Sequence, residues 1–293
     1  MLNTQKNNIY LGLTFGFIAA VIWASFPAIT KLGIEQTLTL YDIAALRFTV
    51  AGIILLPIFW RKRFIGVSYP GVILIACGAG APYLIIATGG LSLTPASHFG
   101  VITPSCMLIF ATLGSYLWLG NKPHRNQLIG ISLIIAGLLF IGWEGLLNSH
   151  HNAWVGDLML VVAGCFWAIY TVAIRYWSVE PLHAITIVSV VSMIGYVPAY
   201  LFAGNSMILF APASEIILQA LFQGLLSAIL ALLFYTRAVA ILGAARGAIF
   251  GALVPSLALI LAFPILGEIP TLLQWLGVFI VTLGMMGFLR SGN

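Results

Sequence analysis

The stretch from Leu119 to Gly130, LGNKPHRNQLIG, is matched by LGEIPTLLQWLG from Leu266 to Gly277, 147 residues further along the chain. Both stretches have the pattern LGxxPxxxQxxG. Apolar helices use few residue types, so one shared glycine would mean little. A spaced pattern of this length is hard to obtain by chance, and it therefore indicates an internal repeat.

Two further matches lie upstream in the same order. The sequence FGVITP at residues 99–104 corresponds to FGALVP at 250–255, and Trp23 with Lys31 corresponds to Trp167 with Arg175. The duplicated unit therefore covers the chain. We predict a first repeat over residues 1–147 and a second over 148–293.

The composition places this repeat in a membrane. Of the 293 residues, 61% are hydrophobic and only 6% are charged, and the mean hydropathy is +1.11, whereas soluble domains are roughly 25% charged. A membrane span needs about 20 apolar residues. With charges, prolines and polar clusters as boundaries, we predict ten helices: Tyr10–Thr30, Asp42–Trp60, Tyr69–Leu91, Ala96–Leu119, Asn126–Trp143, Val155–Trp177, Leu182–Ala203, Ser214–Ile241, Ala245–Leu266 and Thr271–Arg290.

Each repeat holds five helices, so the second repeat must enter the membrane from the opposite side. The predicted fold class is an all-α integral membrane protein, with ten transmembrane helices arranged as two inverted five-helix repeats around a central cavity. Inverted repeats are typical of secondary transporters, in which the binding site lies near the bilayer midplane and opens to each side in turn.

The positive residues orient the chain. With a cytoplasmic N-terminus, the cytoplasmic side collects ten of the twelve Lys and Arg residues, and the other side keeps only Lys31 and Arg47. This asymmetry predicts a cytoplasmic (inner) membrane protein with both termini in the cytoplasm. The net charge of +5 then indicates loops against an anionic membrane surface rather than binding to nucleic acid.

Three segments also carry a family resemblance: Ala-Leu-Arg-Phe at residues 45–48, the run from Pro255 to Leu-Gly-Glu at 266–268, and Gln-Trp-Leu-Gly at 274–277. They resemble the ten-helix EamA-type members of the drug/metabolite transporter superfamily. The resemblance implies that the first, third, fourth, sixth, eighth and ninth helices surround the cavity, that the fifth and tenth are peripheral, and that amino acids or related metabolites are exported. One departure is that Asn121 stands where the second repeat has Glu268.

Charged residues within the spans are candidates for function because charge inside a bilayer is costly. Only thirteen residues separate Arg47 from Arg61, so Arg47 must lie within the second span. It either pairs with Asp42 or Glu35, extends outward to the interface, or acts as a gate or substrate anchor.

Lys31 and Arg175 lie at equivalent helix ends on opposite faces of the membrane. Each either anchors its helix at a headgroup boundary or closes a gate. In a gate, Lys31 would pair with Glu35, Asp42 or a neighbouring acid, and Arg175 would pair with Glu180.

His98 is the histidine that falls inside an apolar span. It is either a hydrogen-bonded structural residue or a site for proton coupling or substrate binding, since histidine changes charge near neutral pH.

Aromatic residues related by the repeat, together with polar groups in the third and eighth helices, complete the candidate substrate site. The symmetric tryptophans could face one shared cavity or serve only in packing, and Tyr83, Tyr235 and Gln223 are weaker candidates. Pro104 and Pro255 are expected to kink their helices. The aromatic and polar candidates for substrate binding, besides His98, are Trp23, Phe26, Tyr83, Phe99, Trp167, Tyr170, Gln223, Tyr235 and Phe250.

Missing motifs narrow the function. No Asp or Glu is expected deep in a span, which disfavours cationic drugs and favours a neutral or zwitterionic solute. There is no GxxxxGK[ST] motif for ATP, and Cys77, Cys106 and Cys165 lack metal-ligand spacing, so we expect no cofactor and no metal.

The predicted function is a monomeric or homodimeric secondary transporter exporting an amino acid or related small metabolite by alternating access, with protons as a candidate coupling ion. The alternatives are a membrane enzyme acting on lipids and a non-transporting scaffold.

Overall fold

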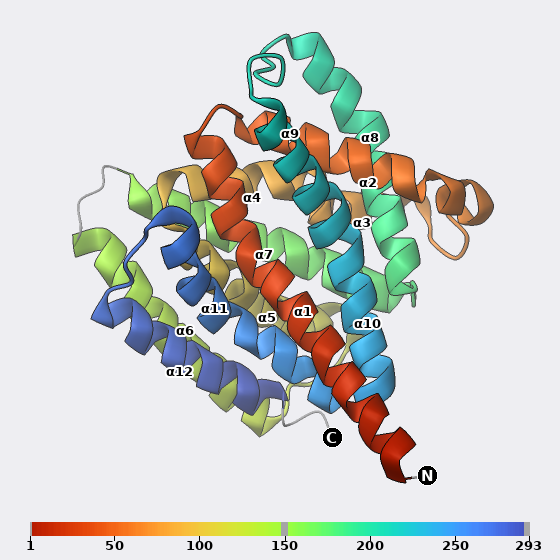
Figure 1. Ribbon diagram of the computed structural model, residues 1–293. Helices are drawn as coiled ribbons and strands as arrows, with labels where there is room; N and C mark the ends of the chain where they lie inside the picture. The colour runs from red at the N-terminus through yellow and green to blue at the C-terminus, as the bar shows by residue number, and fades with distance from the viewer. Residues whose placement is uncertain (1, 148–151, 290–293) are drawn as a thin grey trace.

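The computed structural model describes residues 2–147 and 152–289, without the side chains of residues 2–8, 144–147 and 244–245. The predicted boundary between the repeats, at 147/148, and Arg290 at the predicted end of the last helix lie outside or at the edge of the described residues. The described residues form helices and connecting turns, arranged as one bundle (Figure 1).

Ten of the helical segments in the described chain are long and apolar enough to cross a membrane, as predicted. The third span consists of α3 and α4, and the eighth consists of α9, η1 and α10. The elements are α1 (Leu2–Glu35), α2 (Leu40–Lys62), α3 (Tyr69–Ala79), α4 (Ala81–Leu93), α5 (Ala96–Leu119), α6 (Arg125–Leu147), α7 (Ala153–Tyr176), α8 (Pro181–Ala203), α9 (Ala213–Gln219), η1 (Ala220–Leu230), α10 (Ala231–Leu242), α11 (Ala244–Leu266) and α12 (Leu272–Leu289).

The helix containing the first predicted span extends beyond it at both ends, from Leu2 to Glu35, while the apolar span itself begins at Ile9. One predicted helix description is wrong: the third helix is broken at Gly80 rather than continuous. A side chain at Gly80 would lie 2.1 Å from the Ala76 carbonyl oxygen and 2.3 Å from Ser192 Oγ. The Ser192 hydroxyl accepts a hydrogen bond from the freed Ala81 amide at 3.2 Å, so a contact from α8 satisfies a backbone group that the break exposes.

The repeated Leu-Gly pair ends a helix in each half. Gly120 follows α5 with φ +70° and Gly267 follows α11 with φ +73°, the left-handed conformation that glycine adopts most easily at a helix C-terminus. Pro123 and Pro270 then lie in the turns that lead to the next helices. The Leu-Gly pair of the repeated motif therefore marks the C-terminal end of a helix in each half.

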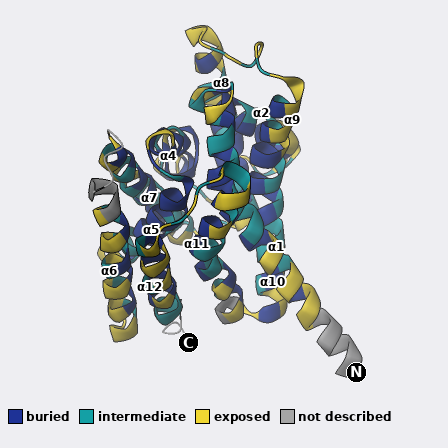
Figure 2. Ribbon diagram, turned by 60° about the vertical axis from the view of Figure 1, so that its left-hand side comes forward, coloured by how far each residue is buried: buried dark blue, intermediate teal, exposed yellow. Residues whose placement is uncertain are grey.

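Helices α6 and α12, the fifth and tenth spans, pack side by side at one edge of the bundle, as the resemblance implies (Figures 1 and 2). Gly130 lies against Gly284, and Gly137 lies against Gly277, with each added Cβ falling within 2.9 Å of the facing carbonyl oxygen. The order of these contacts shows that the two helices run antiparallel. Glycines at equivalent positions in the two repeats thus form one close crossing.

The other packing pairs also follow the repeat. Helix α1 packs against α11 and α10, and its equivalent α7 packs against α5 and the α3–α4 span. Figure 2 shows buried residues where the helices meet and exposed residues on outward faces. Many of the exposed side chains are large and apolar, such as Phe17, Ile53 and Leu139, as expected of a surface in contact with lipid.

The bundle has two chemically different ends. The described cations that gather at the basic end are Arg61, Lys62, Arg63, Lys122, Arg125, Arg175, Arg237 and Arg246. The opposite, acidic end carries Glu35, Asp42, Asp157, Glu215 and Glu268. Helix α1 begins and α12 ends in the lower part of Figure 1, at the basic end.

Candidate functional site

Two aromatic pairs lie in the interior on helices related by the repeat. The ring of Trp23 on α1 lies 5.3 Å from that of Tyr235 on α10, and the ring of Trp167 on α7 lies 4.8 Å from that of Tyr83 on α4. Tyr83 and Tyr235, which the sequence ranks as weaker candidates, are thus the partners of the two tryptophans. Each half of the repeat contributes one ring to each pair.

A third aromatic contact distinguishes the two halves. Phe26 on α1 lies 5.3 Å from Phe99 on α5. Their repeat equivalents are separated, because Tyr170 packs against Trp167 while Phe250 lies on α1 at Gly16, where an added Cβ would come within 2.2 Å of its ring. The interior is therefore asymmetric, with α1 and α5 in ring contact where α7 and α11 are not.

Arg47 on α2 is buried beside this aromatic region. It is 8% exposed, and its guanidinium carbon lies 5.6 Å from the centre of the Phe26 ring. Its hydrogen bonds to the Gln223 carbonyl, the Gln223 side chain and Ser227 Oγ are long, at 3.4, 3.5 and 3.3 Å. All three acceptors are uncharged.

Two sequence interpretations of Arg47 are therefore wrong. The residue neither pairs with Asp42 or Glu35 nor extends outward to the interface. Among the described residues, the ion pairs do not include Arg47. Asp42 is instead bound by Thr39, Tyr200 and the Met207 amide, because it caps the start of its own helix.

Gln223 connects Arg47 to the eighth span. It is fully buried, its amide donates to Thr30 Oγ1 at 2.8 Å and to Gln219 Oε1 at 3.2 Å, and Gln219 donates to the Ile29 carbonyl. Gln223 lies in η1, a π-helix, which widens the turn and is frequent at functional sites. Hydrogen-bonded polar side chains, those of Thr30, Gln219 and Gln223, thus connect α1 to the eighth span beside Arg47.

Lys31 joins the end of α1 to the residues that follow α4 and α11 at the acidic end. Its ammonium group donates to Glu268 Oε1 at 3.0 Å and to the Thr94 carbonyl at 2.7 Å, and it lies 3.8 Å from Glu35. Glu268 also accepts from the Ala96 amide, which begins α5. Of the acids that the sequence offers, the neighbouring acid Glu268 is the main partner, and Asp42 is not one.

His98 is likewise paired with an acid. Its Nδ1 lies 2.8 Å from Asp157 Oδ1, and the two side chains are 3% and 14% exposed. Asp157 lies one turn inside α7 and is largely buried, although the sequence predicts no acid deep in a span. Histidine donor and acceptor roles depend on the tautomer, and the contact joins α5 to α7 in either case.

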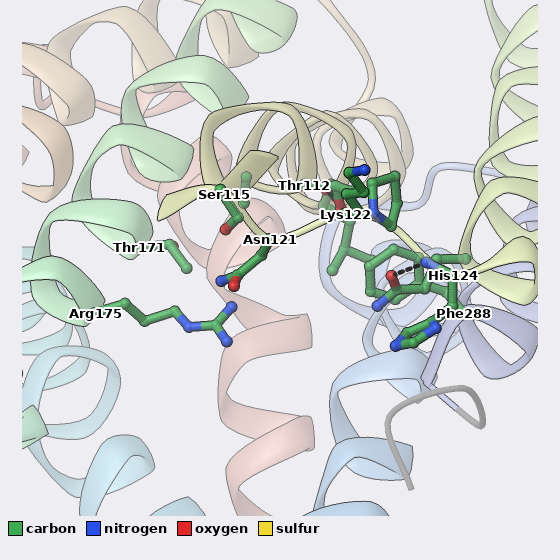
Figure 3. Close-up of a pocket in the computed structure, with 13 residues that line it drawn as sticks. Thr112, Ser115, Asn121, Lys122, His124, Thr171, Arg175 and Phe288 are labelled. Carbon is green, nitrogen blue, oxygen red and sulfur yellow. Dashed lines mark hydrogen bonds between the residues drawn. The ribbon is translucent and has the colours of Figure 1, made fainter. Parts of the chain in front are cut away.

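A cavity of about 690 Å³ lies at the basic end. Figure 3 shows Arg175 reaching into it from α7 and Asn121 from the turn after α5. Of the residues predicted to form the site, only Arg175 lines this cavity. Its walls are formed by Leu108, Ala111, Thr112, Ser115, Gly120, Asn121, Lys122, Pro123, His124, Gln127, Thr171, Arg175 and Phe288.

The predicted gate between Arg175 and Glu180 is wrong. Glu180 pairs with Lys62 at 2.6 Å, and this hydrogen bond lowers the pKa of the Glu180 carboxyl below its usual range. The reason is geometric: Glu180 precedes α8, which packs along α2, so it meets the end of α2 rather than the cavity.

The remaining predicted residues have structural positions. Pro104 lies inside α5 and Pro255 inside α11, and both helices continue past them. Among the described residues, no three His, Cys, Asp or Glu side chains cluster as a metal site would require.

These observations define a multi-pass membrane protein with an inverted repeat, a buried cation beside an aromatic ring, an ion-paired contact at one end and a cavity at the other. The chain belongs to the EamA-like transporter family, whose model matches it twice, over residues 10–143 and 154–290. It is thus a member of the drug/metabolite transporter superfamily, as the sequence resemblance implied.

Individual relatives agree with this assignment. An uncharacterized transporter of Archaeoglobus fulgidus is 24% identical over 96% of both chains. A probable amino-acid metabolite efflux pump of Salmonella typhimurium is 26% identical over 76% of this chain and 82% of its own. A solved crystal structure matches 94% of this chain and 95% of its own with a TM-score of 0.58 at 19% identity, which shows the fold.

Proposed function

We propose that this protein is a secondary transporter that exports an amino acid or a related carboxylate-bearing metabolite across the cytoplasmic membrane. The observation that carries the proposal is Arg47, a cation buried among aromatic rings without an acidic partner in the described chain. A buried cation is costly unless a counter-charge reaches it. A substrate carboxylate would supply that charge.

The surroundings of Arg47 suit the rest of such a solute. The aromatic pairs offer apolar contact, and Gln223 and Ser227 offer polar groups that fix orientation. The proposed substrate site comprises Arg47 with Trp23, Phe26, Tyr83, His98, Phe99, Trp167, Tyr170, Gln223, Tyr235 and Phe250.

Alternating access is supported by the asymmetry between the ends. The Lys31–Glu268 contact and the Phe26–Phe99 contact hold the acidic end together, while the basic end is hollow. We propose that two inverted halves, residues 1–147 and 148–293, exchange these arrangements during transport. The relative named an efflux pump supports export as the direction.

The distribution of charge supports the orientation that export requires. Most cations lie at the basic end, which we place in the cytoplasm by the positive-inside rule. The cavity then opens toward the cytoplasmic supply of substrate.

Counterflow in proteoliposomes tests the function. Vesicles preloaded with one amino acid at a time, across all standard amino acids, are diluted into trace radiolabelled solute without ATP. We expect uptake of label above that of empty liposomes for at least one solute. Uniform failure would contradict the proposal, and turnover of lipid or capture of a stable protein partner by the same preparation would favour a membrane enzyme or a scaffold instead.

A further inference from the structure

The starting observation is the role of Glu268 at the acidic end. Its carboxylate joins the cation at the end of α1 to the start of α5, through Lys31 Nζ at 3.0 Å and the Ala96 amide at 3.0 Å. One carboxylate thus connects the end of one helix to the beginning of another. Both partners are donors, as a carboxylate requires.

The repeat predicts the same arrangement at the basic end, with one exchange. Arg175 corresponds to Lys31, and the residue corresponding to Glu268 in the LGxxP motif is Asn121. Both residues line the cavity, and Figure 3 shows the two side chains directed into the same space. In the described chain, the Arg175 guanidinium has no hydrogen-bonded or ion-paired partner.

The chemistry of the cavity favours an anion. Its lining includes Arg175 and Lys122 but no Asp or Glu, and the Asn121 amide and Ser115 hydroxyl can add donors. An arginine fork also binds a carboxylate in a geometry that a point charge cannot match.

Two threonines that line the same cavity, Thr112 on α5 and Thr171 on α7, indicate what else the ligand carries. The hydroxyl protons of Thr112 and Thr171 are donated to the carbonyls of Leu108 and Trp167, at 2.7 and 2.8 Å. Their oxygens can therefore only accept. An ammonium group suits such oxygens, so the cavity offers complementary groups to both ends of a zwitterion.

We propose that this cavity is a carboxylate-binding site in which the ligand's carboxylate takes the place at Arg175 that Glu268 holds at Lys31. The site is distinct from the region around Arg47, since the cavity lining contains none of the aromatic pairs. The assignment of the ligand as the transported solute rests on the proposed function. The binding chemistry itself does not.

Cysteine labelling tests the site without any transport measurement. Ala111→Cys places a reporter in the cavity wall after Cys77, Cys106 and Cys165 are replaced by alanine. The protein is reconstituted in phosphatidylcholine nanodiscs, where both faces are accessible and anionic lipid is absent. The rate of reaction with a charged maleimide is then measured with acetate, and with acetamide plus sodium chloride at matched ionic strength.

We expect acetate at about four times its Kd to slow labelling about fivefold, because only the unoccupied fraction of the site reacts, and acetamide to leave the rate unchanged. Arg175→Gln should abolish the acetate effect, and Arg175→Lys should keep part of it. Asn121→Glu should slow labelling without acetate because it supplies the missing carboxylate, whereas the matched Asn121→Gln should not.

Three results would overturn the proposal. The first two are that acetate leaves the labelling rate of the parent protein unchanged, or that it slows labelling of Arg175→Gln as much as that of the parent protein. The third is an Asn121→Glu variant that is folded, as judged by size-exclusion chromatography, and is labelled as fast as the parent protein without acetate. Slowing by phosphatidylglycerol nanodiscs with no further effect of acetate would instead assign the cavity to a lipid phosphate. If acetate protects the cavity cysteine but counterflow fails for every solute, only the proposed function is refuted. If counterflow succeeds but acetate gives no protection, only this binding site is refuted.

Discussion

At the scale of single residues, Arg47 connects sequence to function most directly. Its position in the second span follows from the short distance to Arg61, but its three uncharged acceptors come from η1, about 180 residues away in sequence. The aromatic contact with Phe26 adds stabilisation without neutralising the charge.

Replacing Arg47 tests its proposed contact with substrate. We expect Arg47→Gln to raise the half-saturating concentration for the solute found by counterflow at least about 30-fold, since losing one partner of a buried charge pair costs about 2 kcal/mol or more. Arg47→Lys keeps the charge and should retain part of the affinity. Wild-type affinity in Arg47→Gln would remove Arg47 from the substrate site.

The His98–Asp157 pair is the corresponding candidate for proton coupling. The acids and bases near it are Asp157 on α7 and the Glu268–Lys31 pair, which reaches the start of α5 at Ala96. Histidine is suited to this role because its charge changes between about pH 5 and 8.

We expect His98→Gln and Asp157→Asn to flatten the dependence of transport on pH between 5.5 and 8 by about the same degree, because each breaks the same pair. Flux over this pH range in proteoliposomes measures the effect. A profile like that of the parent protein in both variants would assign coupling elsewhere or show facilitated diffusion.

At the scale of helices, glycine determines how closely two spans approach. Gly137 on α6 would place a Cβ 2.7 Å from the Gly277 carbonyl oxygen, whereas Gly142 on the same helix has open space around it. The two positions therefore separate a packing requirement from helix propensity.

We predict that Gly137→Ala destabilises the protein by about 1–3 kcal/mol because it overpacks the crossing. The matched Gly142→Ala should be neutral or slightly stabilising, since alanine favours a helix over glycine. Thermal unfolding in detergent measures both. Equal midpoints for the two variants would show that the close crossing does not limit stability.

At the scale of the whole molecule, one exchange in the repeated motif, Asn121 for Glu268, distinguishes the two ends. Glu268 completes a charged contact at the acidic end, and Asn121 leaves the equivalent contact open at the basic end. The order in which the ends open would then depend on which one holds a carboxylate.

We expect Glu268→Gln to open the acidic end, because Lys31 keeps the Thr94 carbonyl but loses its main acidic partner, which the exposed Glu35 at 3.8 Å replaces poorly. A Ser97→Cys reporter in the chain without its native cysteines should label about tenfold faster, equivalent to about 1.4 kcal/mol. Glu35→Gln is the matched control and should change the rate little. Equal rates in the two variants would show that Glu268 does not hold this end.

The sequence by itself determined the number of spans, the repeat and the family, because hydrophobic length and motif spacing are properties of local chain segments. It also located Lys31, Arg47, His98 and Arg175 correctly at helix positions. Local patterns did not reveal the break at Gly80, because the sequence around it is uniformly apolar. The hydroxyl that accepts a hydrogen bond from the Ala81 amide at the break belongs to Ser192, which is on α8.

Only the tertiary structure decided which residues meet. Lys31 and Glu268 are 237 residues apart in sequence, and His98 and Asp157 are 59 apart, so their pairing depends on how α1, α5, α7 and α11 pack. Within the described residues, the same packing left Arg47 and Arg175 without acidic partners. The sequence shows which residues are charged, but the fold determines which residues they pair with, because electrostatic interaction depends on distance in space rather than along the chain.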